Sequence, residues 1–271
     1  MKISILNKFQ KSDLKISPFP HIVLKDALNK DIASTLTKEF PLHEFDLSGN
    51  NLRRDIPSYK VANALKISNL WRDFIKYHSS RQFYIEVLNA FKEALSEKDF
   101  KKYNDYQTGL RGFNSHKRNK VLMDAQISIN TPVEKLSSVR KAHLDNTNKF
   151  FSGLFYLRLP NDDSRGGNLQ LCKWREEYTL SKKIKLYRES LHQNHYEVFD
   201  ELKYENNLAV LFLNSIESLH SVTPRYETSY PRCFVNLVGE EKDDIFYKQR
   251  FLSRKTTEVK NLLRKFINRP D

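Results

Sequence analysis

Apolar residues in the first part of the chain recur at helical spacing. Over residues 29–40 they fall on one face, which predicts an amphipathic helix. The same spacing runs through residues 68–95 in two pieces, and Ser79 or Ser80 at the break could cap the second helix. The pattern therefore predicts a helical support region over residues 1–120.

From residue 121 the pattern changes to an alternation of apolar and polar residues with a period of two. The segments that alternate are 121–130, 149–159, 167–174, 208–214 and 232–239. Short strands separated by turn residues are typical of antiparallel sandwiches and barrels. A polar, charged stretch at 175–200 interrupts the pattern and is interpreted as an insertion that could shape access to a site. We expect a mainly β core over 121–239.

The last part of the chain, 240–271, predicts a helical extension. Its apolar residues have the spacing of one helix face: Val259, Leu262, Leu263, Phe266 and Ile267. The pattern favours packing on the β core or on a second subunit, which leaves a homodimer open, over contact with a membrane. Residues 1–271 are expected to form a single domain of α+β class, with a mainly β core.

The chain carries a net charge of +13, which could attract nucleic acid or anionic metabolites. The charges are spread along the sequence, so a solvated basic surface is favoured over a nucleic-acid partner. No apolar run is long enough to span a membrane, and the N-terminus lacks the features of a signal peptide. The two cysteines, Cys172 and Cys233, cannot form a disulfide framework. A cytoplasmic location is expected, with both thiols buried.

Three residues have the types and spacing of a metal site. His143 and Asp145 are two residues apart, so in an extended segment their side chains point to the same side. His220 follows the predicted strand at 208–214 and supplies a second histidine. Two histidines and one carboxylate on one face hold Fe(II) while leaving positions open for other ligands. His192 and His195 have no third ligand nearby and are expected to be surface residues.

Residues 121–239 resemble the 2-oxoglutarate/Fe(II)-dependent oxygenase superfamily, in particular its prolyl-4-hydroxylase-like branch. The motifs that carry the resemblance are His143-Leu144-Asp145, Tyr156-Leu157, Gly166-Gly167-Asn168-Leu169 and His220-Ser221-Val222-Thr223-Pro224. The family places a basic residue about ten positions after the last histidine. Here Arg232 comes twelve positions later, at the start of a predicted strand, and Arg225 comes five positions later. Arg232 is preferred, and Arg225 is the alternative.

The resemblance implies a double-stranded β-helix, a jelly-roll or cupin-like barrel, with iron bound by His143, Asp145 and His220. It further implies 2-oxoglutarate as co-substrate, with three residues around it. Their expected roles are a salt bridge to its distal carboxylate from Arg232, a hydroxyl donor from Tyr156 and an apolar wall from Val222. The family consumes O2 and releases succinate and CO2. The implied activity is hydroxylation of an aliphatic C–H in a small molecule or a peptidyl, proline-like residue. Halogenation is disfavoured, because related halogenases lack the carboxylate that Asp145 supplies.

Strand parity identifies candidate substrate residues. Gln126 and Asn130 lie on one face of a predicted strand, and Asn236 shares a face with Arg232 in another. A polar inward row beside a metal suits substrate binding, although a solvated face explains the pattern equally well. Two other functions stay open. One is oxidative demethylation of nucleic acid, which the charge allows although the second arginine typical of those members is missing. The other is a catalytically silent jelly-roll binding protein.

Overall fold

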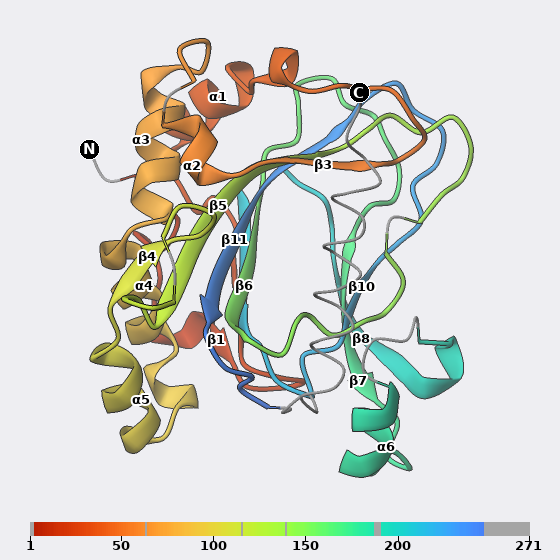
Figure 1. The fold of residues 1–271 in the computed structure, drawn as a ribbon. Helices are drawn as coiled ribbons and strands as arrows, with labels where there is room; N and C mark the ends of the chain where they lie inside the picture. The colour runs from red at the N-terminus through yellow and green to blue at the C-terminus, as the bar shows by residue number, and fades with distance from the viewer. Residues whose placement is uncertain (1–2, 63, 115, 139, 187–190, 247–271) are drawn as a thin grey trace, which may run out of the picture.

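The computed structural model describes residues 3–62, 64–114, 116–138, 140–186 and 191–246. The amphipathic helix predicted at 259–267, and a homodimer formed through it, lie outside the described residues. Helices pack on one side of a large β-sheet, and a small sheet faces its other side (Figure 1). The site described below lies between the two sheets.

The N-terminal helices form where the apolar spacing predicts them, and polar side chains cap them. The α-helices are α1 (Lys30–Lys38), α2 (Ser58–Val61), α3 (Asn69–His78), α4 (Arg81–Ala90), α5 (Glu97–Asn104) and α6 (Leu180–Leu186). The Ser80 hydroxyl accepts a hydrogen bond from the Phe83 amide at the start of α4, so Ser80 is the cap at the break between the two predicted helices. Ser68 and Asn29 cap α3 and α1 in the same way. Helix α1 ends at Lys38, two residues before the predicted end.

The large sheet has eight strands, mostly antiparallel. Its order is β1 (Leu14–Lys15), β2 (His21–Leu24), β9 (Leu208–Leu213), β6 (Lys149–Tyr156), β11 (Arg232–Glu241), β5 (Val121–Asn130) and β3 (Arg53–Ile56), with β4 (Thr108–Leu110) parallel to β5. The small sheet has the order β10 (His220–Val222), β7 (Leu169–Trp174) and β8 (Tyr196–Leu202). The five segments with a period of two correspond to β5, β6, β7, β9 and β11, which confirms the predicted mainly β core.

The strands do not close into the single barrel that the resemblance implied. Over the described residues they pair as two separate sheets. Side-chain packing joins the sheets where backbone pairing does not: Tyr156, Phe212 and Phe234 of the large sheet share a buried apolar cluster with Leu169 and Leu171 of the small sheet. The sequence therefore forms two facing sheets, with apolar side chains packed in part of the space between them.

The predicted insertion at 175–200 contains more structure than expected. It includes α6, and its last residues begin β8, which pairs with β7 in an antiparallel hairpin. Strand β8 was missed because residues on both of its faces are largely exposed, so no apolar alternation marks it. Only the part before Tyr196 is a connection between strands.

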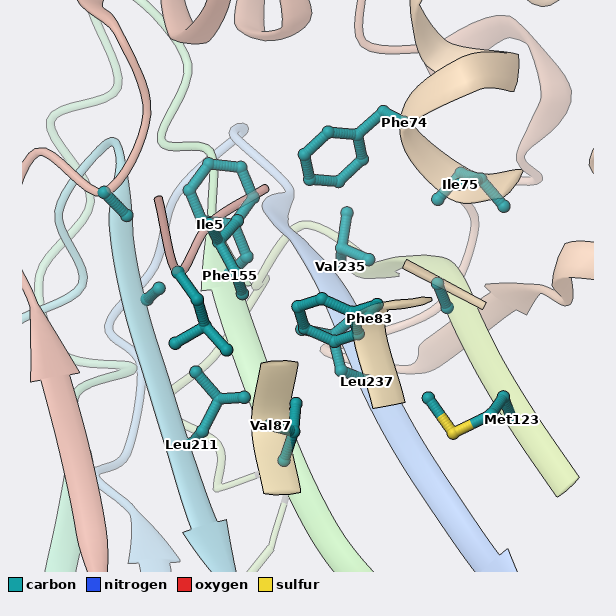
Figure 2. Close-up of a cluster of buried hydrophobic side chains, with 14 of the residues drawn as sticks. Ile5, Phe74, Ile75, Phe83, Val87, Met123, Phe155, Leu211, Val235 and Leu237 are labelled. Atoms are coloured by element: carbon teal, nitrogen blue, oxygen red, sulfur yellow. The ribbon is translucent and has the colours of Figure 1, made fainter. Parts of the chain in front are cut away.

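The main core lies between the helices and the outer face of the large sheet. Phe74 of α3 and Phe83 of α4 pack against Phe155 and Val235 from β6 and β11 (Figure 2). The rings of Phe74 and Phe155 lie 5.6 Å apart, centre to centre. Each such side chain contributes about 1.5–3 kcal/mol when it is fully buried. This packing fixes which face of each strand points away from the helices.

Strand β11 shows the consequence of that packing for the interior. Cys233, Val235 and Leu237 belong to the core against the helices, so Arg232 and Asn236 face the small sheet. Arg232 pairs with Asn130 of β5 in the register of the two strands. The predicted alternation of inward and outward side chains along β11 is thus confirmed. It places Arg232 and Asn236 in the space between the sheets.

Cys172 and Cys233 are buried free thiols, as expected. Burial raises the pKa of the Cys172 thiol to about 11. No helix among the described residues is long and apolar enough to cross a membrane.

A buried histidine in the helical layer predicts a pH dependence of stability. His78 is fully buried; its Nε2 accepts a hydrogen bond from the Ile5 amide and its other ring nitrogen faces the Phe74 carbonyl. Burial lowers the pKa of His78 to about 3. The unfolded chain, in which the histidine has its ordinary pKa near 6.5, therefore binds more protons than the folded chain between pH 6.5 and 3. Stability should fall as pH falls through this window, by up to about 1.4 kcal/mol per unit.

The measurement is the free energy of unfolding by urea between pH 7 and 5, for wild type and for His78→Gln. Glutamine keeps a donor and an acceptor but does not titrate. We expect the free energy of unfolding to fall less steeply with falling pH in the variant, because the variant lacks the titration of His78. Identical slopes for the two proteins would contradict the assignment.

Candidate metal centre

Backbone pairing brings the two predicted histidines side by side. His143, in the connection after β5, and His220, at the start of β10, exchange hydrogen bonds of 3.0 and 3.2 Å between their backbone amides and carbonyls. Their rings lie 4.3 Å apart, centre to centre. Asp145 follows two residues after His143, and its Oδ1 lies 3.9 Å from the Nε2 of His143. One ligand atom from each residue lies within 4.8 Å of the others, so the three could hold a metal ion.

Both histidines have the tautomer that leaves Nε2 free to bind a metal. The Nδ1 of His143 faces the Lys141 carbonyl at 2.8 Å, and that of His220 faces the Ser218 carbonyl at 2.9 Å. A carbonyl only accepts, so each Nδ1 carries the proton and each Nε2 keeps its lone pair. Burial lowers the pKa of both rings; for His143 the neighbouring His220 lowers it further. Both imidazoles are therefore neutral and ready to bind a cation near pH 7.

Asp145 is buried and kept ionised by its neighbours. The Ser152 hydroxyl donates to Oδ2 at 2.6 Å, and the Asn214 amide donates to that hydroxyl at 3.0 Å. The ammonium of Lys149 lies 3.2 Å from Oδ1. Burial alone would raise the pKa of Asp145, but Lys149, the two neighbouring histidines and the Ser152 hydroxyl outweigh it and hold the pKa well below its usual value. One oxygen is thus oriented by hydrogen bonds, and the other faces the histidines.

A cavity of about 200 Å³ opens beside the three residues, between the two sheets. That volume holds roughly a dozen water molecules. A small organic acid would fit in it. Asn130 and Asn236 from the large sheet line it, as does Val222 from the small sheet. Gln126 does not line it; its side-chain oxygen accepts a hydrogen bond of 2.8 Å from Asn236 instead. Of the three candidate substrate residues, two therefore face the cavity and the third positions one of them.

Arg232 lines the cavity and is almost completely buried, with 3% of its surface exposed. Its guanidinium donates to the Tyr156 hydroxyl at 2.8 Å and to the Asn130 side-chain oxygen at 3.2 Å. Among the described residues neither partner is a carboxylate, and Nε is buried without any partner. Since a buried charge is costly unless it is paired, this arrangement favours an anionic ligand.

Arg225 is also buried, but unlike Arg232 it donates mainly to backbone carbonyls. Its guanidinium donates to the side-chain oxygen of Asn51 at 3.0 Å and to the carbonyls of Thr131 and Tyr230 at 2.9 and 2.7 Å. It does not line the cavity. Burial, with the charge of Arg232 nearby, lowers its pKa to about 10. Of the two arginines that the sequence left as alternatives, Arg232 lines the cavity and Arg225 does not.

The pair Gly166-Gly167 allows the backbone to pass close to both arginines. Both glycines have a positive φ, +79° and +74°. A Cβ at Gly166 would lie 1.9 Å from the Pro224 carbonyl oxygen, and one at Gly167 would lie 3.1 Å from carbons of Arg225 and Arg232. The glycine motif is thus explained by close packing behind the arginine that faces the cavity.

Replacing Gly166 with alanine should lower the free energy of unfolding by at least about 2 kcal/mol, because the methyl group meets backbone in a left-handed conformation. Gly49 offers a matched control. Its φ is +90°, but a Cβ there meets the end of the exposed Leu52 side chain, which can move away. Gly49→Ala should therefore cost less in a urea unfolding experiment. Equal losses for the two variants would contradict the packing argument.

The structure adds residues around the cavity that the sequence did not identify. They are Arg53, Arg140, Lys149 and Ser152. Ser152 had a weak signal, since it is the polar residue on the inward face of an otherwise apolar strand. Arg140 and Lys149 had none, because lysines and arginines in loops and at strand ends are usually solvated. His192 is exposed and His195 half-buried, and within the described part of the chain the only cluster able to hold a metal is that of His143, Asp145 and His220.

No protein-family model matches the sequence, and neither does any curated protein. The chain is similar in structure to a Pseudomonas putida prolyl-4-hydroxylase, with 12% identity over 82% of this chain and 92% of that one and a TM-score of 0.44. It is similar to a prolyl 4-hydroxylase from Phytophthora capsici, with 18% identity over 96% of this chain and 72% of that one and a TM-score of 0.45. It is also similar to HygX from Streptomyces hygroscopicus, a structure with nickel and 2-oxoglutarate bound, with 13% identity over 85% of each chain and a TM-score of 0.39.

Proposed function

We propose that this protein is an Fe(II)- and 2-oxoglutarate-dependent oxygenase. One observation carries the proposal: two neutral histidines and one ionised carboxylate converge beside a cavity that also holds a buried arginine without a carboxylate partner. Two histidines and a carboxylate are the ligand set of non-haem Fe(II) oxygenases, which need open positions on the metal.

The residues present fit both groups. His143, Asp145 and His220 would hold iron, through the two free Nε2 atoms and the carboxylate. Arg232 would bind the distal carboxylate of 2-oxoglutarate. The side-chain nitrogen of Asn130, which is buried without a partner among the described residues, is a second donor nearby. The Tyr156 hydroxyl accepts from Arg232, which leaves its own proton free for a third hydrogen bond to that carboxylate. Each unsatisfied buried donor costs about 1–3 kcal/mol, and a dianion in the cavity would relieve it.

When bound, iron and 2-oxoglutarate together supply an oxidant from O2, with release of succinate and CO2. The chain's own part is to bind and orient. Ser152 fixes the Asp145 carboxylate, the Lys141 and Ser218 carbonyls fix the two rings, and Val222 gives the co-substrate an apolar wall. The two sheets enclose the site, which limits water around a reactive centre.

The proposal extends to the architecture and the reaction. The two facing sheets correspond to a double-stranded β-helix within a single oxygenase domain. The reaction would be hydroxylation, or another oxidation, of an aliphatic C–H in a small molecule or a peptidyl residue, with Asn130 and Asn236, and Gln126 behind them, near the substrate. Halogenation is disfavoured, because Asp145 occupies the position that a halide would need.

Formation of succinate tests the proposal. Purified protein is incubated in air with Fe(II), ascorbate and 2-oxoglutarate, and succinate is quantified by mass spectrometry. We expect slow succinate formation even without a substrate, dependent on both additions. If succinate stays at the level of a protein-free control at every Fe(II) concentration, the proposed activity is wrong.

A further inference from the structure

The wall of the cavity carries more positive charge than the proposed co-substrate can neutralise. In the described part of the chain, four basic residues line it, Arg53, Arg140, Lys149 and Arg232, against a single carboxylate, Asp145. The Nε of Arg53 pairs with Asp55 at 2.9 Å, so its charge is met outside the cavity. Arg232 faces the proposed 2-oxoglutarate site. Arg140 and Lys149 are the two remaining cations at the cavity wall.

Arg140 and Lys149 both lie against the carboxylate oxygen that a metal would use. The Nζ of Lys149 is 3.2 Å from Oδ1 of Asp145, and a guanidinium nitrogen of Arg140 is 4.0 Å from it. The same oxygen faces the Nε2 of His143. A divalent cation held by Asp145 would repel both side chains and take their partner. Once the metal is bound, the two cations beside it have no other carboxylate partner among the described residues.

A sum of formal charges leads to the same result. A divalent metal with Asp145 leaves one positive charge, and 2-oxoglutarate with Arg232 leaves one negative charge, so these four groups cancel. Arg140 and Lys149 then contribute two uncompensated positive charges at the cavity wall. The Lys149 side chain is only 15% exposed, so water compensates its charge poorly, while that of Arg140, at 51%, reaches the solvent.

We propose that Arg140 and Lys149 form an oxyanion subsite for the substrate, which is a small molecule carrying a carboxylate or a phosphate. This inference rests on the proposed function and narrows its substrate class. The planar fork of Arg140 suits two oxygens of one oxyanion, and the ammonium of Lys149 adds a charge next to the metal. A neutral internal peptide segment would leave both cations unpaired, so it fits the cavity less well.

Pairs that consist of an anionic probe and a neutral analogue test this subsite. They are N-acetylproline and N-acetylprolinamide, hexanoate and hexanamide, and hexyl phosphate and hexanol. Each binds to the full chain loaded with Zn(II) and saturated with 2-oxoglutarate, so that Arg232 is occupied, and binding is measured by ligand-observed NMR. We expect at least one anion to bind about tenfold more tightly than its neutral partner. Preference for carboxylates or for the phosphate identifies the group.

Two variants locate the preference. Arg140→Gln and Lys149→Gln should each reduce anion affinity by about tenfold and leave the neutral probes unchanged. Lys66→Gln, at an exposed lysine away from the cavity, is the matched control and should change neither. Anion affinity is compared at saturating Zn(II), because Lys149 also helps to keep the metal ligand Asp145 ionised. A fall in anion affinity at full metal occupancy then reports on the subsite. This readout separates a lost subsite from a damaged metal centre.

The outcomes separate the two proposals. Protein that binds the metal and 2-oxoglutarate but treats acids and their neutral partners alike overturns the oxyanion subsite alone. Preference for anions that survives in both variants also overturns it, since other residues would then be responsible. Equal binding of N-acetylproline and N-acetylprolinamide would favour a peptidyl substrate. Protein that binds neither metal nor 2-oxoglutarate contradicts the proposed function itself.

Discussion

Replacing Asp145 with alanine should weaken Fe(II) binding by more than a hundredfold and abolish succinate formation. Loss of a residue that only supports a metal ligand already costs about 10–100-fold in affinity, and Asp145 is proposed as a ligand itself. It is also the only carboxylate facing the two histidines in the described part of the chain. Without it, two neutral rings remain beside the cations Arg140 and Lys149, which repel a metal.

The affinity is measured by anaerobic titration of Fe(II), with Co(II) as a spectroscopic substitute. Asp55→Asn is the control, because Asp55 is a carboxylate that pairs with Arg53 at the cavity wall and is not one of the three ligands. It should bind metal as wild type does. Full metal affinity in Asp145→Ala would show that the metal binds elsewhere.

Replacing Arg232 with methionine should raise the dissociation constant of 2-oxoglutarate by about a hundredfold or more, because breaking a buried ion pair costs about 3–5 kcal/mol. Methionine fills much of the same volume without a charge or a donor. The rings of Tyr156, Tyr204 and Phe234 around the guanidinium should keep it packed. Metal affinity should not fall, since Arg232 is not a ligand. Calorimetric titration of 2-oxoglutarate into Zn(II)-loaded protein measures the change.

Arg225→Met separates the two arginines that the sequence could not. Its loss leaves the Thr131 and Tyr230 carbonyls and the Asn51 side chain without their donor. The free energy of unfolding should fall by about 3 kcal/mol or more, at about 1–3 kcal/mol for each buried acceptor. The protein that remains folded should bind 2-oxoglutarate as wild type does. The reverse result, in which only Arg225→Met loses 2-oxoglutarate, would move the anchor to Arg225.

Much of the fold is visible in the sequence because the signals are local. Helices α3 and α4 have apolar spacing and serine caps. Strand β5 alternates from Met123 to Asn130, and β11 has Arg232 and Asn236 on one face, so the polar face of each strand is visible in the sequence. Parity placed Asn130 with Gln126 on one face of its strand and Arg232 with Asn236 on one face of another. The register of β11 with β5 makes Arg232 and Asn130 neighbours. The side chains of His143 and Asp145 point to the same side because residues two positions apart in an extended segment do so.

Other parts depend on where distant segments meet. The pairing of His143 with His220 comes from a backbone bridge between a loop and a strand, which no local pattern encodes. Lys149 and Ser152 reach Asp145 because the turn before β6 returns the chain to it. Strand β8 is exposed on both faces and carries no alternation. The separation into two sheets likewise reflects packing across the interior, as between Phe234 and Leu169.

A visible absorption spectrum of the protein with Fe(II) and 2-oxoglutarate, recorded without oxygen, tests most directly whether the chain binds both at one site. Chelation of 2-oxoglutarate to an iron that has open positions gives a weak metal-to-ligand charge-transfer band. We expect this band to saturate at one Fe(II) per chain, to be missing in Asp145→Ala, and to need much more 2-oxoglutarate in Arg232→Met. A wild-type protein that binds Fe(II) but shows no band at any 2-oxoglutarate concentration would contradict this expectation.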